Sequence, residues 1–457
     1  MDVQLMQLQG NYPPIGLGYL ASTLEEEGIS VGILDFGGLG YAPEQLFEHV
    51  REDLERTSPD FVGITCLTTQ AHLALEVARI AKEVCHDCHT VLGGPHPTAA
   101  PVEVARDPSV DFVVVGEGER TLLELVRTRS EPDRLGGVEG LVYKDGGRVV
   151  ATPPRRLIQN LDEIPFPSYH LFPGRKLNLR VDAHGIDTRG RYMEVFTSRG
   201  CPYQCIYCHK MFGKKFRARS PENVLEEIEL LYQRYRIREI HFEDDCFNLD
   251  VKRAKRILDL LIEGGMDLSI RFPNGLRADL VDEELISKMK KAGAYQISIG
   301  VETASPRVMR MIKKRLDLRR VEETVRLALK HGLTMRGFFM IGFPGETREE
   351  IMQTIGYAKN LDVHFASLSI VTPYPGTELY DMAVRGGYIK DRDYSRYFFD
   401  RASIESPEFT RQELEEIARR AEKEFYEHPR RRDLLLPAAE YSKSELLNLT
   451  ERVQRTV

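Results

Sequence analysis

Short apolar runs alternate with helix-like patterns through the first third of the chain. Strands that alternate with helices at this spacing predict a parallel, doubly wound sheet. Ligands of such sheets bind beyond the carboxyl ends of the strands. The strand-like runs are Ile29–Leu34, Phe61–Thr65, Thr90–Leu92 and Asp111–Val115, and the helix-like patterns are Tyr19–Glu26, Leu73–Glu83 and Thr121–Arg127.

Polar and small residues at these strand ends are candidate binding residues. Glycine lets a large ring approach the backbone closely, and hydroxyl groups can hydrogen-bond a nucleotide tail or amide side chains. Any single glycine there could equally serve only a turn. The candidates are Thr65, Thr68, Thr69, Gln70, Gly93, Gly94, His96, Gly116, Glu117 and Gly118.

The alternation of strands and helices restarts at Arg191. Six strand-like runs with helices between them predict a partial (β/α)6 barrel, whose chemistry belongs at the carboxyl ends of its strands. The runs are Tyr192–Thr197, Glu239–Glu243, Leu268–Phe272, Gln296–Val301, Thr334–Ile341 and Phe365–Val371, and helical patterns include Pro221–Tyr235, Val281–Lys291, Leu318–His331 and Arg348–Lys359.

A hairpin and a Pro-rich stretch separate the two α/β regions. Leu141–Lys144 and Arg148–Ala151 read as its strands, and Pro-rich segments of this kind are semi-rigid. The end of the chain is polar, with helical spacing at Arg411–Tyr426 and Ser444–Arg455. We therefore expect a first domain at 1–139, a hairpin and linker at 140–190, a barrel at 191–385 and a helical extension at 386–457.

Composition narrows the class of protein. Hydrophobic residues make up 42% of the 457 residues and charged residues 29%, as in ordinary soluble globular proteins. A net charge of −7 argues against nucleic acid as the main partner. No N-terminal signal and no apolar run long enough to span a membrane is visible, so we expect a cytoplasmic protein. Seven cysteines suit ligation better than disulfides; the separate pair Cys85 and Cys88 has no partner pair elsewhere, which favours chance placement.

Three cysteines, Cys201, Cys205 and Cys208, lie in one short loop directly after a predicted strand. Three thiolates can hold three irons of a cubane cluster and leave the fourth iron open to another ligand. A closed zinc site would need a fourth Cys or His, and His209 is awkward because it adjoins Cys208. A zinc knuckle and buried structural thiols are the alternatives.

Polar groups follow the later barrel strands as well. Asp244 and Asp245 could take the ammonium of an amino acid, and Glu302 could accept two ribose hydroxyls. Arg277 follows the third strand, and the turn after the fifth, 340–346, could place its backbone against an adenine edge. Any one of these acids could instead be a helix N-terminal charge.

The spacing Cys-x3-Cys-x2-Cys, with Tyr207 before the last cysteine, resembles that of the radical S-adenosylmethionine (SAM) enzymes. Phrases similar to their core follow in order: Arg219-Ser-Pro-Glu-Asn-Val224, Phe242-Glu-Asp-Asp245, Gly300-Val-Glu-Thr303 and Phe339-Met-Ile-Gly-Phe-Pro-Gly-Glu-Thr347. The resemblance implies a [4Fe-4S] cluster on Cys201, Cys205 and Cys208. It implies SAM contacts at Tyr207, Asp244, Asp245, Arg277, Glu302, Ile341 and Gly342.

The first third resembles the Rossmann-like cobalamin-binding domain that precedes many radical SAM cores. The resemblance rests on Pro13-Pro-Ile-Gly-Leu-Gly-Tyr-Leu20, Gly93-Gly-Pro-His96 and Phe112-Val-Val-Val-Gly-Glu-Gly-Glu119. It implies cobalamin at the strand-end residues given above. The motif Asp-x-His-x2-Gly, which supplies the lower axial His of cobalamin in mutases, is missing. Asp87-Cys-His89 matches its first three residues, but Leu92 stands where the motif needs Gly.

Together the resemblances imply a cobalamin-dependent radical SAM enzyme, foremost a methyltransferase acting on an unactivated carbon of a small-molecule or natural-product substrate. It would act through a 5′-deoxyadenosyl radical and methylcobalamin, and no side chain is assigned a catalytic role beyond the cofactors. An external electron donor of flavodoxin or ferredoxin type is implied too. The alternatives are an oxidative cyclase, oxidase or ring-rearranging enzyme with the same cofactors, and a non-catalytic cobalamin- or zinc-binding protein.

Overall fold

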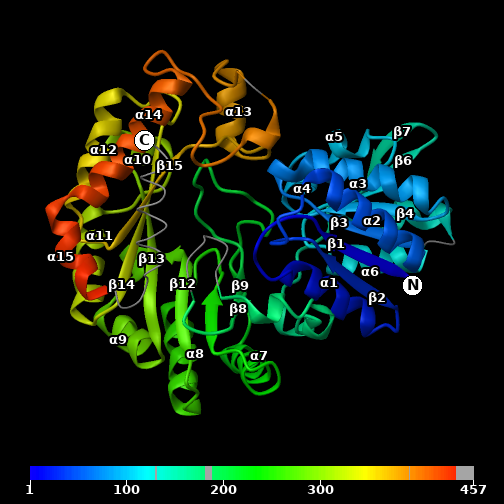
Figure 1. The fold of residues 1–457 in the computed structure, drawn as a ribbon, viewed down its shortest axis with the longest axis horizontal. Coiled ribbons are helices and arrows are strands. Elements are labelled where there is room, and N and C mark those ends of the chain that lie inside the picture. Colours follow the sequence, from blue (N-terminus) through cyan, green and yellow to red (C-terminus); the bar gives the residue numbers. More distant parts are fainter. Residues whose placement is uncertain (129–130, 181–187, 391, 439–457) are drawn as a thin grey trace.

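The computed structural model describes residues 1–128, 131–180, 188–390 and 392–438. Two α/β units lie side by side, the N-terminal sheet in one and the later parallel strands in the other (Figure 1). The expected helix Ser444–Arg455 falls outside the described residues. No helix in the described ranges is both long enough and apolar enough to cross a membrane.

The first unit is built on a seven-stranded sheet with the order β2-β1-β3-β4-β5-β6-β7. Its first five strands are parallel, which confirms the predicted doubly wound sheet, and the order reverses between β1 and β3, where such sheets bind ligands. The predicted hairpin continues this sheet antiparallel to β5 instead of standing apart as linker. The strands are β1 (Val3–Gln7), β2 (Val31–Asp35), β3 (Phe61–Thr65), β4 (His89–Gly93), β5 (Phe112–Val114), β6 (Leu141–Asp145) and β7 (Arg148–Ala151).

Helices pack on both faces of this sheet. Along β1, Leu5 belongs to the hydrophobic cluster on the side of α1 and α6, whereas Met6 belongs to the cluster on the side of α2 and α3. All five β1 residues are buried, but Gln4 and Gln7 interrupt the continuous apolar run that marks a strand covered on both faces, so this strand was not predicted. The helices are α1 (Ile15–Glu25), α2 (Pro43–Thr57), α3 (Ala71–Val84), α4 (Pro95–Ala99), α5 (Pro101–Ala105) and α6 (Glu119–Thr128).

The second unit is the predicted partial barrel. Its six parallel strands follow the order β15-β14-β13-β12-β11-β8, so β8 and β15 are the two edges of an open sheet. The strands are β8 (Tyr192–Val195), β11 (Glu239–Phe242), β12 (Ser269–Leu276), β13 (Ala294–Glu302), β14 (Thr334–Ile341) and β15 (Phe365–Ile370). The short strands β9 (Ser198–Arg199) and β10 (Arg217–Ala218) pair with each other just after β8.

Capping residues set where the barrel helices begin. Ser220, Asp250, Asp282 and Thr347 each accept a backbone N–H of the first turn of the following helix. Together with the strand runs these caps explain why the helices were predictable. The helices are α7 (Pro221–Arg234), α8 (Val251–Gly264), α9 (Glu283–Lys291), α10 (Pro306–Met311), α11 (Leu318–Lys330) and α12 (Arg348–Asn360).

The linker packs against the first unit, and the C-terminal extension packs against the barrel. In the linker, the buried ammonium of Lys176 donates to Gly10 O (2.9 Å) and Tyr12 O (3.0 Å) and lies 3.4 Å from Asp35 Oδ2. In the extension, α14 (Arg411–Glu427) packs on α12 and β15, next to α13 (Glu378–Arg385) and α15 (Pro429–Ala438) in chain order (Figure 1). The linker therefore pins the loops after β1 and β2.

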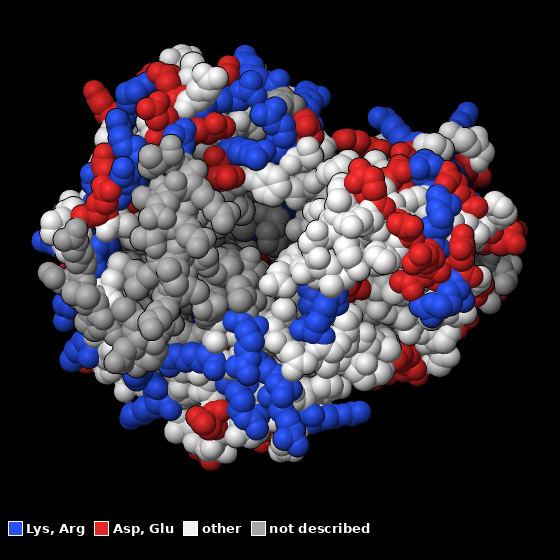
Figure 2. Space-filling model, in the orientation of Figure 1, with Lys and Arg blue, Asp and Glu red and all other residues white. Residues whose placement is uncertain are grey.

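Charged residues are distributed unevenly over the face drawn in Figure 2. Acidic and basic side chains are interspersed on the N-terminal unit, whereas Lys and Arg gather along the lower edge of the barrel unit. Uncharged surface flanks much of the junction between the units on that face.

Candidate active site at the junction of the two units

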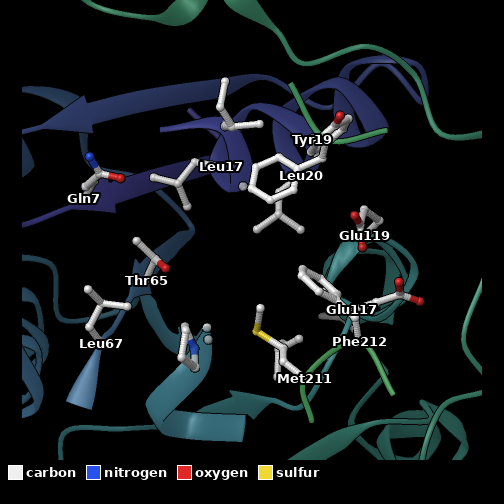
Figure 3. Close-up of a pocket in the computed structure, with 18 of the residues that line it drawn as sticks. Gln7, Leu17, Tyr19, Leu20, Thr65, Leu67, Glu117, Glu119, Met211 and Phe212 are labelled. Atoms are coloured by element: carbon white, nitrogen blue, oxygen red, sulfur yellow. The ribbon is translucent and has the colours of Figure 1, made fainter. Parts of the chain in front are cut away.

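A cavity of about 400 Å³ opens between the strand ends of the N-terminal sheet and the first strands of the barrel. Figure 3 shows Leu17 and Leu20 of α1 turned toward the same space as Met211 and Phe212 from the barrel side. Further lining from the barrel side includes Phe196, Arg199, His209, Asp245 and Asn274. One continuous, largely apolar space thus touches both units.

Most of the predicted cobalamin residues line this cavity. They are Thr65, Gln70, Gly93, Gly94, Gly116, Glu117 and Gly118. A Cβ added to Gly93 or Gly116 would meet no protein atom closer than 3.9 Å, so a side chain there would fill cavity space. Gly94 is needed for another reason. Its φ of +95° disfavours any residue with a side chain, and an added Cβ would lie only 2.9 Å from Thr65 Oγ1. This cradle fits the close approach of a large planar ring.

Three predicted positions are placed differently. Thr68, Thr69 and His96 are not among the described residues that line the cavity. His96 is buried, its backbone N–H donates to Cys66 O (3.0 Å), and its ring lies 5.3 Å from that of Tyr394 in the extension. Burial lowers the pKa of His96 to about 4, so it is neutral at physiological pH. It packs the extension against the N-terminal unit.

Several lining residues were not predicted individually. Leu17 and Leu20 belong to the segment quoted for the family resemblance, which supplied the signal without assigning the residues, and Tyr12 directly precedes that segment. Met211 and Phe212 follow the last clustered cysteine and carried no sequence signal of their own. Apolar side chains at a ligand site are indistinguishable from core in sequence.

The cysteine loop, residues 200–216, is held between the paired strands β9 and β10. Burial raises the pKa of Cys201, and it raises that of Cys208 to about 12. The carboxylate of Asp245 raises both pKa values further, and Cys205 adds a smaller contribution to each. Gly200 has a φ of +82°, and a Cβ there would lie 2.5 Å from Lys215 O, so only glycine allows the loop to close.

The donor set fits an iron–sulfur cluster. The fit is one of donor chemistry, because three cysteines lie in one short loop; among the described residues no three His, Cys, Asp or Glu side chains, these cysteines included, are grouped closely enough to hold a single metal ion. A cubane places each thiolate on a different iron and needs the three around a shared space. The pair Cys85 and Cys88 does not join them: both lie at the end of α3, with the thiols directed to the carbonyls of Leu54 and Ala81 (3.5 Å each).

The two adjacent aspartates after β11 point in different directions. Asp244 is buried and accepts from Thr197 N (3.1 Å) and Thr197 Oγ1 (2.8 Å), so its carboxylate secures the strand end. Asp245 accepts from Gly200 N (3.0 Å) and lines the cavity. Of the two predicted SAM contacts, Asp245 is therefore the one placed to reach a ligand.

The remaining predicted SAM contacts surround the cysteine loop. The carboxylate of Glu302 lies 3.0 Å from Lys314 Nζ, and Glu302 has a φ of +69°. Arg277 donates to Lys314 O (3.2 Å) and Arg315 O (3.1 Å) and lies over the ring of Tyr203, so its guanidinium is occupied by protein. Burial raises the pKa of Tyr207 well above its ordinary value, and the negative charge of Glu302 raises it further.

The end of β14 completes the site. Ile341 is buried, Gly342 N donates to Glu346 Oε2 (2.7 Å), and the ring of Phe343 lies 6.0 Å from that of Tyr207. A Cβ at Gly342 would collide with Leu414 of α14. The turn is therefore shaped from one side by Glu346 and from the other by the extension.

A doubly wound sheet whose strand ends open onto a half-barrel with three clustered cysteines defines a cobalamin-binding radical SAM protein. The family models agree: the B12 binding domain matches residues 2–126 and the radical SAM superfamily matches residues 195–358. The chain belongs to the cobalamin-dependent radical SAM family, whose cofactors are a [4Fe-4S] cluster, SAM and cobalamin.

Three relatives illustrate this membership. An uncharacterized methyltransferase of Pyrococcus horikoshii is 39% identical over 421 residues, covering 92% of this chain and 88% of the relative. The cytidylyl-2-hydroxyethylphosphonate methyltransferase of Streptomyces wedmorensis is 30% identical over 429 residues, covering 84% and 80%. An anaerobic magnesium-protoporphyrin IX monomethyl ester cyclase of Rubrivivax gelatinosus is 29% identical over 407 residues, covering 86% and 70%.

Solved structures share the fold. The radical SAM methyltransferase TsrM of Kitasatospora setae, with cobalamin and a [4Fe-4S] cluster bound, superposes with a TM-score of 0.70 at 21% identity, covering 85% of this chain and 79% of that one. The cobalamin-dependent SAM radical enzyme OxsB gives a TM-score of 0.65 at 21% identity, covering 86% and 56%. At this identity the likeness concerns the fold alone.

Proposed function

We propose that the protein transfers a methyl group to an unactivated carbon of a small-molecule substrate. The observation that carries this proposal is the single cavity, which is lined both by the glycine cradle around Gly93 and Gly116 and by residues beside the cysteine loop. A substrate in that space would contact both cofactors. The methyltransferase names of two relatives, 39% and 30% identical to this chain, support the same reaction.

When bound, the cluster and SAM supply a radical that removes a substrate hydrogen, and cobalamin supplies the methyl group. The chain holds and orients these groups. Cys201, Cys205 and Cys208 are the proposed cluster ligands, and Glu302 and Asp245 are the proposed polar contacts to SAM. The apolar walls exclude water, which protects a reactive intermediate from side reactions.

The proposal includes a cellular setting. All seven cysteines are free thiols, as expected for a protein of the reducing cytoplasm. A cluster that must be reduced for each radical formed needs an external donor, and we include one of the flavodoxin or ferredoxin type in the proposal.

A second candidate function keeps the cofactors but changes the outcome. Relatives named as anaerobic cyclases match 86% and 89% of this chain, so oxidative ring closure is the specific competitor. Both reactions consume SAM, but only methyl transfer places its methyl carbon in the product.

The test is anaerobic turnover with SAM carrying a deuterated methyl group, in the presence of a reductant and the small-molecule fraction of the source cells. We expect a new labelled product by mass spectrometry, together with 5′-deoxyadenosine. A product that forms without label would favour the cyclase, and purified protein with zinc and no sulfide would overturn both. Cys205→Ala serves as control: it should stop 5′-deoxyadenosine formation while cobalamin stays bound.

A further inference from the structure

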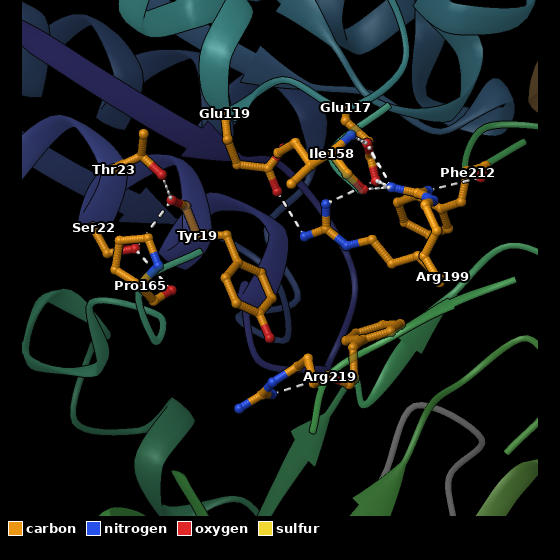
Figure 4. A network of polar contacts seen from close by, with 12 residues as sticks. Tyr19, Ser22, Thr23, Glu117, Glu119, Ile158, Pro165, Arg199, Phe212 and Arg219 are labelled. Carbon is orange, nitrogen blue, oxygen red and sulfur yellow. Dashed lines mark hydrogen bonds and ion pairs between the residues drawn. The ribbon is translucent and has the colours of Figure 1, made fainter. Parts of the chain in front are cut away.

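The segment before the cysteine loop and the Gly116–Glu119 loop are joined by direct ion pairs, which their separation in the sequence did not indicate. Arg199 is two residues before the first cluster cysteine, in the Ser198-Arg-Gly-Cys201 phrase. Its Nη1 lies 3.1 Å from Glu117 Oε1 and its Nη2 lies 2.6 Å from Glu119 Oε1 (Figure 4). One guanidinium thus bonds both glutamates of the Gly116–Glu119 loop, more than 75 residues earlier in the chain.

A second arginine completes the contact. Arg217 of β10 donates from Nη1 to both Glu117 oxygens (2.8 and 3.0 Å) and to Ile158 O (2.6 Å), and from Nη2 to Phe212 O (2.9 Å). Ile158 N in turn donates to Glu117 Oε2 (3.0 Å). Two guanidinium groups and two carboxylates therefore balance in charge, and they bring together both strands that flank the cysteine loop.

This network is buried. The side chains of Arg199, Arg217, Glu117 and Glu119 are 8%, 2%, 3% and 7% exposed. Burial would raise the pKa of Glu119, but the Arg199 guanidinium outweighs it and holds that pKa below its ordinary value. The Arg199–Glu119 pair is thus charged, and a buried pair of charges is sensitive to geometry because each desolvated group needs its partner in place.

The loop that the glutamates occupy is also the wall of the cavity. Gly116 and Gly118 alternate with Glu117 and Glu119, so the glycines offer bare backbone to the proposed corrin while the carboxylates hold Arg199. Arg199 Cζ also lies 5.4 Å from the ring centroids of both Tyr19 and Phe212, which line the cavity. The Arg199 guanidinium therefore lies between the Gly116–Glu119 loop and the cysteine loop.

We infer that Arg199 is a positioning residue: by bonding Glu117 and Glu119 together it sets the Gly116–Glu119 loop relative to the cysteine loop, and so the distance between cobalamin and the SAM site. Replacing buried ion pairs by apolar residues often leaves stability unchanged, so stability alone would not require this network. A planar guanidinium that binds two carboxylates fixes their orientation as well as their distance from the arginine. The inference rests on the proposed function only where methyl transfer is measured.

The first test is a distance that does not depend on activity. In the full-length protein loaded with cobalamin and cluster and kept free of SAM, pulsed EPR between the reduced cluster and Co(II) should give one narrow distance distribution. Arg199→Lys keeps the positive charge but loses the planar guanidinium that reaches both carboxylates. Glu119→Gln keeps the size of the side chain but loses its negative charge. We expect both to broaden or shift the distribution.

The matched control is Arg120→Gln, one residue beyond Glu119, which breaks only the exposed Arg120–Glu163 pair (52% and 58% exposed). It should leave the distribution unchanged. An unchanged distribution in Arg199→Lys and Glu119→Gln, or an equal broadening in Arg120→Gln, would overturn the inference. If Arg199→Lys does not fold, Glu119→Gln decides alone.

The second test measures transfer of labelled methyl from SAM to the bound cobalamin, beside 5′-deoxyadenosine formation. Because a misplacement of about 1 Å can cost about 100-fold in rate, we expect the transfer to fall at least about tenfold in Arg199→Lys while 5′-deoxyadenosine formation stays within about twofold. A parallel loss of both would indicate a merely structural role. Absence of methyl transfer in the unmodified protein would contradict the proposed function but leave the distance test intact.

Discussion

The guanidinium of Arg277, at the end of β12, lies over the ring of Tyr203 with its Cζ 3.6 Å from the ring centroid. Tyr203 stands between Cys201 and Cys205, so this stack ties the cysteine loop to the neighbouring barrel strand. The same guanidinium holds the carbonyls of Lys314 and Arg315. Arg277 therefore links three loops around the proposed cluster.

Arg277→Lys should loosen the cysteine loop, because lysine can neither stack as a plane nor reach both carbonyls. We expect a loss of about 1–3 kcal/mol in the free energy of unfolding, as for a stacked cation and buried hydrogen bonds. Iron and sulfide per chain after anaerobic purification should fall as well. Tyr203→Phe keeps the ring and is the control; a similar loss of iron in that variant would contradict the role given to the stack.

Lys314→Met should destabilise the barrel strongly, because it leaves the carboxylate of Glu302 without its cation in a site where the two side chains are only 9% and 15% exposed. Breaking a buried pair costs about 3–5 kcal/mol. The neighbouring Lys313 pairs with Glu378 at the surface, where both are about 40% exposed, and Lys313→Met should cost less than about 1 kcal/mol. Urea unfolding of both variants checks this, and equal effects would refute it.

Much of the fold could be predicted because local signals agreed with one another. The six barrel strands and the helix starts at Pro221 and Arg348 are confirmed. The strand β12 was predicted to stop at Phe272 but continues to Leu276, across a register shift that lies between these residues. Such an irregularity depends on the neighbouring strand and leaves no local signal.

The sequence predicted which residue types lie at the site and which strand ends carry them, but not the direction in which each side chain points. Asp244 and Asp245 are chemically alike and adjacent, and only the paired strands turn one inward and the other to the cavity. Glu117 was assigned to cobalamin, yet its carboxylate is bonded by Arg199 and Arg217. Partners that lie 82 and 100 residues away cannot be recognised from spacing.

Gly200→Ala should prevent the cysteine loop from closing. The φ of +82° disfavours a side chain by about 1–2 kcal/mol, and the new Cβ would lie 2.5 Å from Lys215 O and 2.9 Å from Phe212 O. We expect little or no iron to be retained. Gly387 also has a positive φ (+67°), but a Cβ there meets nothing within 4 Å, so Gly387→Ala should bear only the backbone cost and keep its iron. Iron retention by Gly200→Ala would argue against this loop geometry.

Glu346 should give the barrel a measurable pH dependence. It is fully buried; one carboxylate oxygen accepts from Gly342 N and Phe343 N, and the other has no hydrogen-bond partner among the described residues. Burial raises its pKa from 4.5 to about 7. The folded state therefore keeps a proton that the unfolded chain releases above its ordinary pKa, so this contribution to stability is present below pH 4.5 and is lost as pH rises toward 7.

The variant Glu346→Gln removes that titration, and its stability relative to the unmodified protein should rise by roughly 3 kcal/mol between about pH 4.5 and 7, as the two pKa values imply. Glu350→Gln is the control of opposite sign. A hydrogen bond from Arg307 lowers the pKa of Glu350 to about 2, so its contribution is lost only as pH falls below 4.5. Urea titrations at a series of pH values should therefore show a slope for Glu346→Gln and a flat difference for Glu350→Gln above pH 5. Two flat differences would mean that Glu346 is ionised in the folded protein and that the turn at Gly342 binds it as a carboxylate.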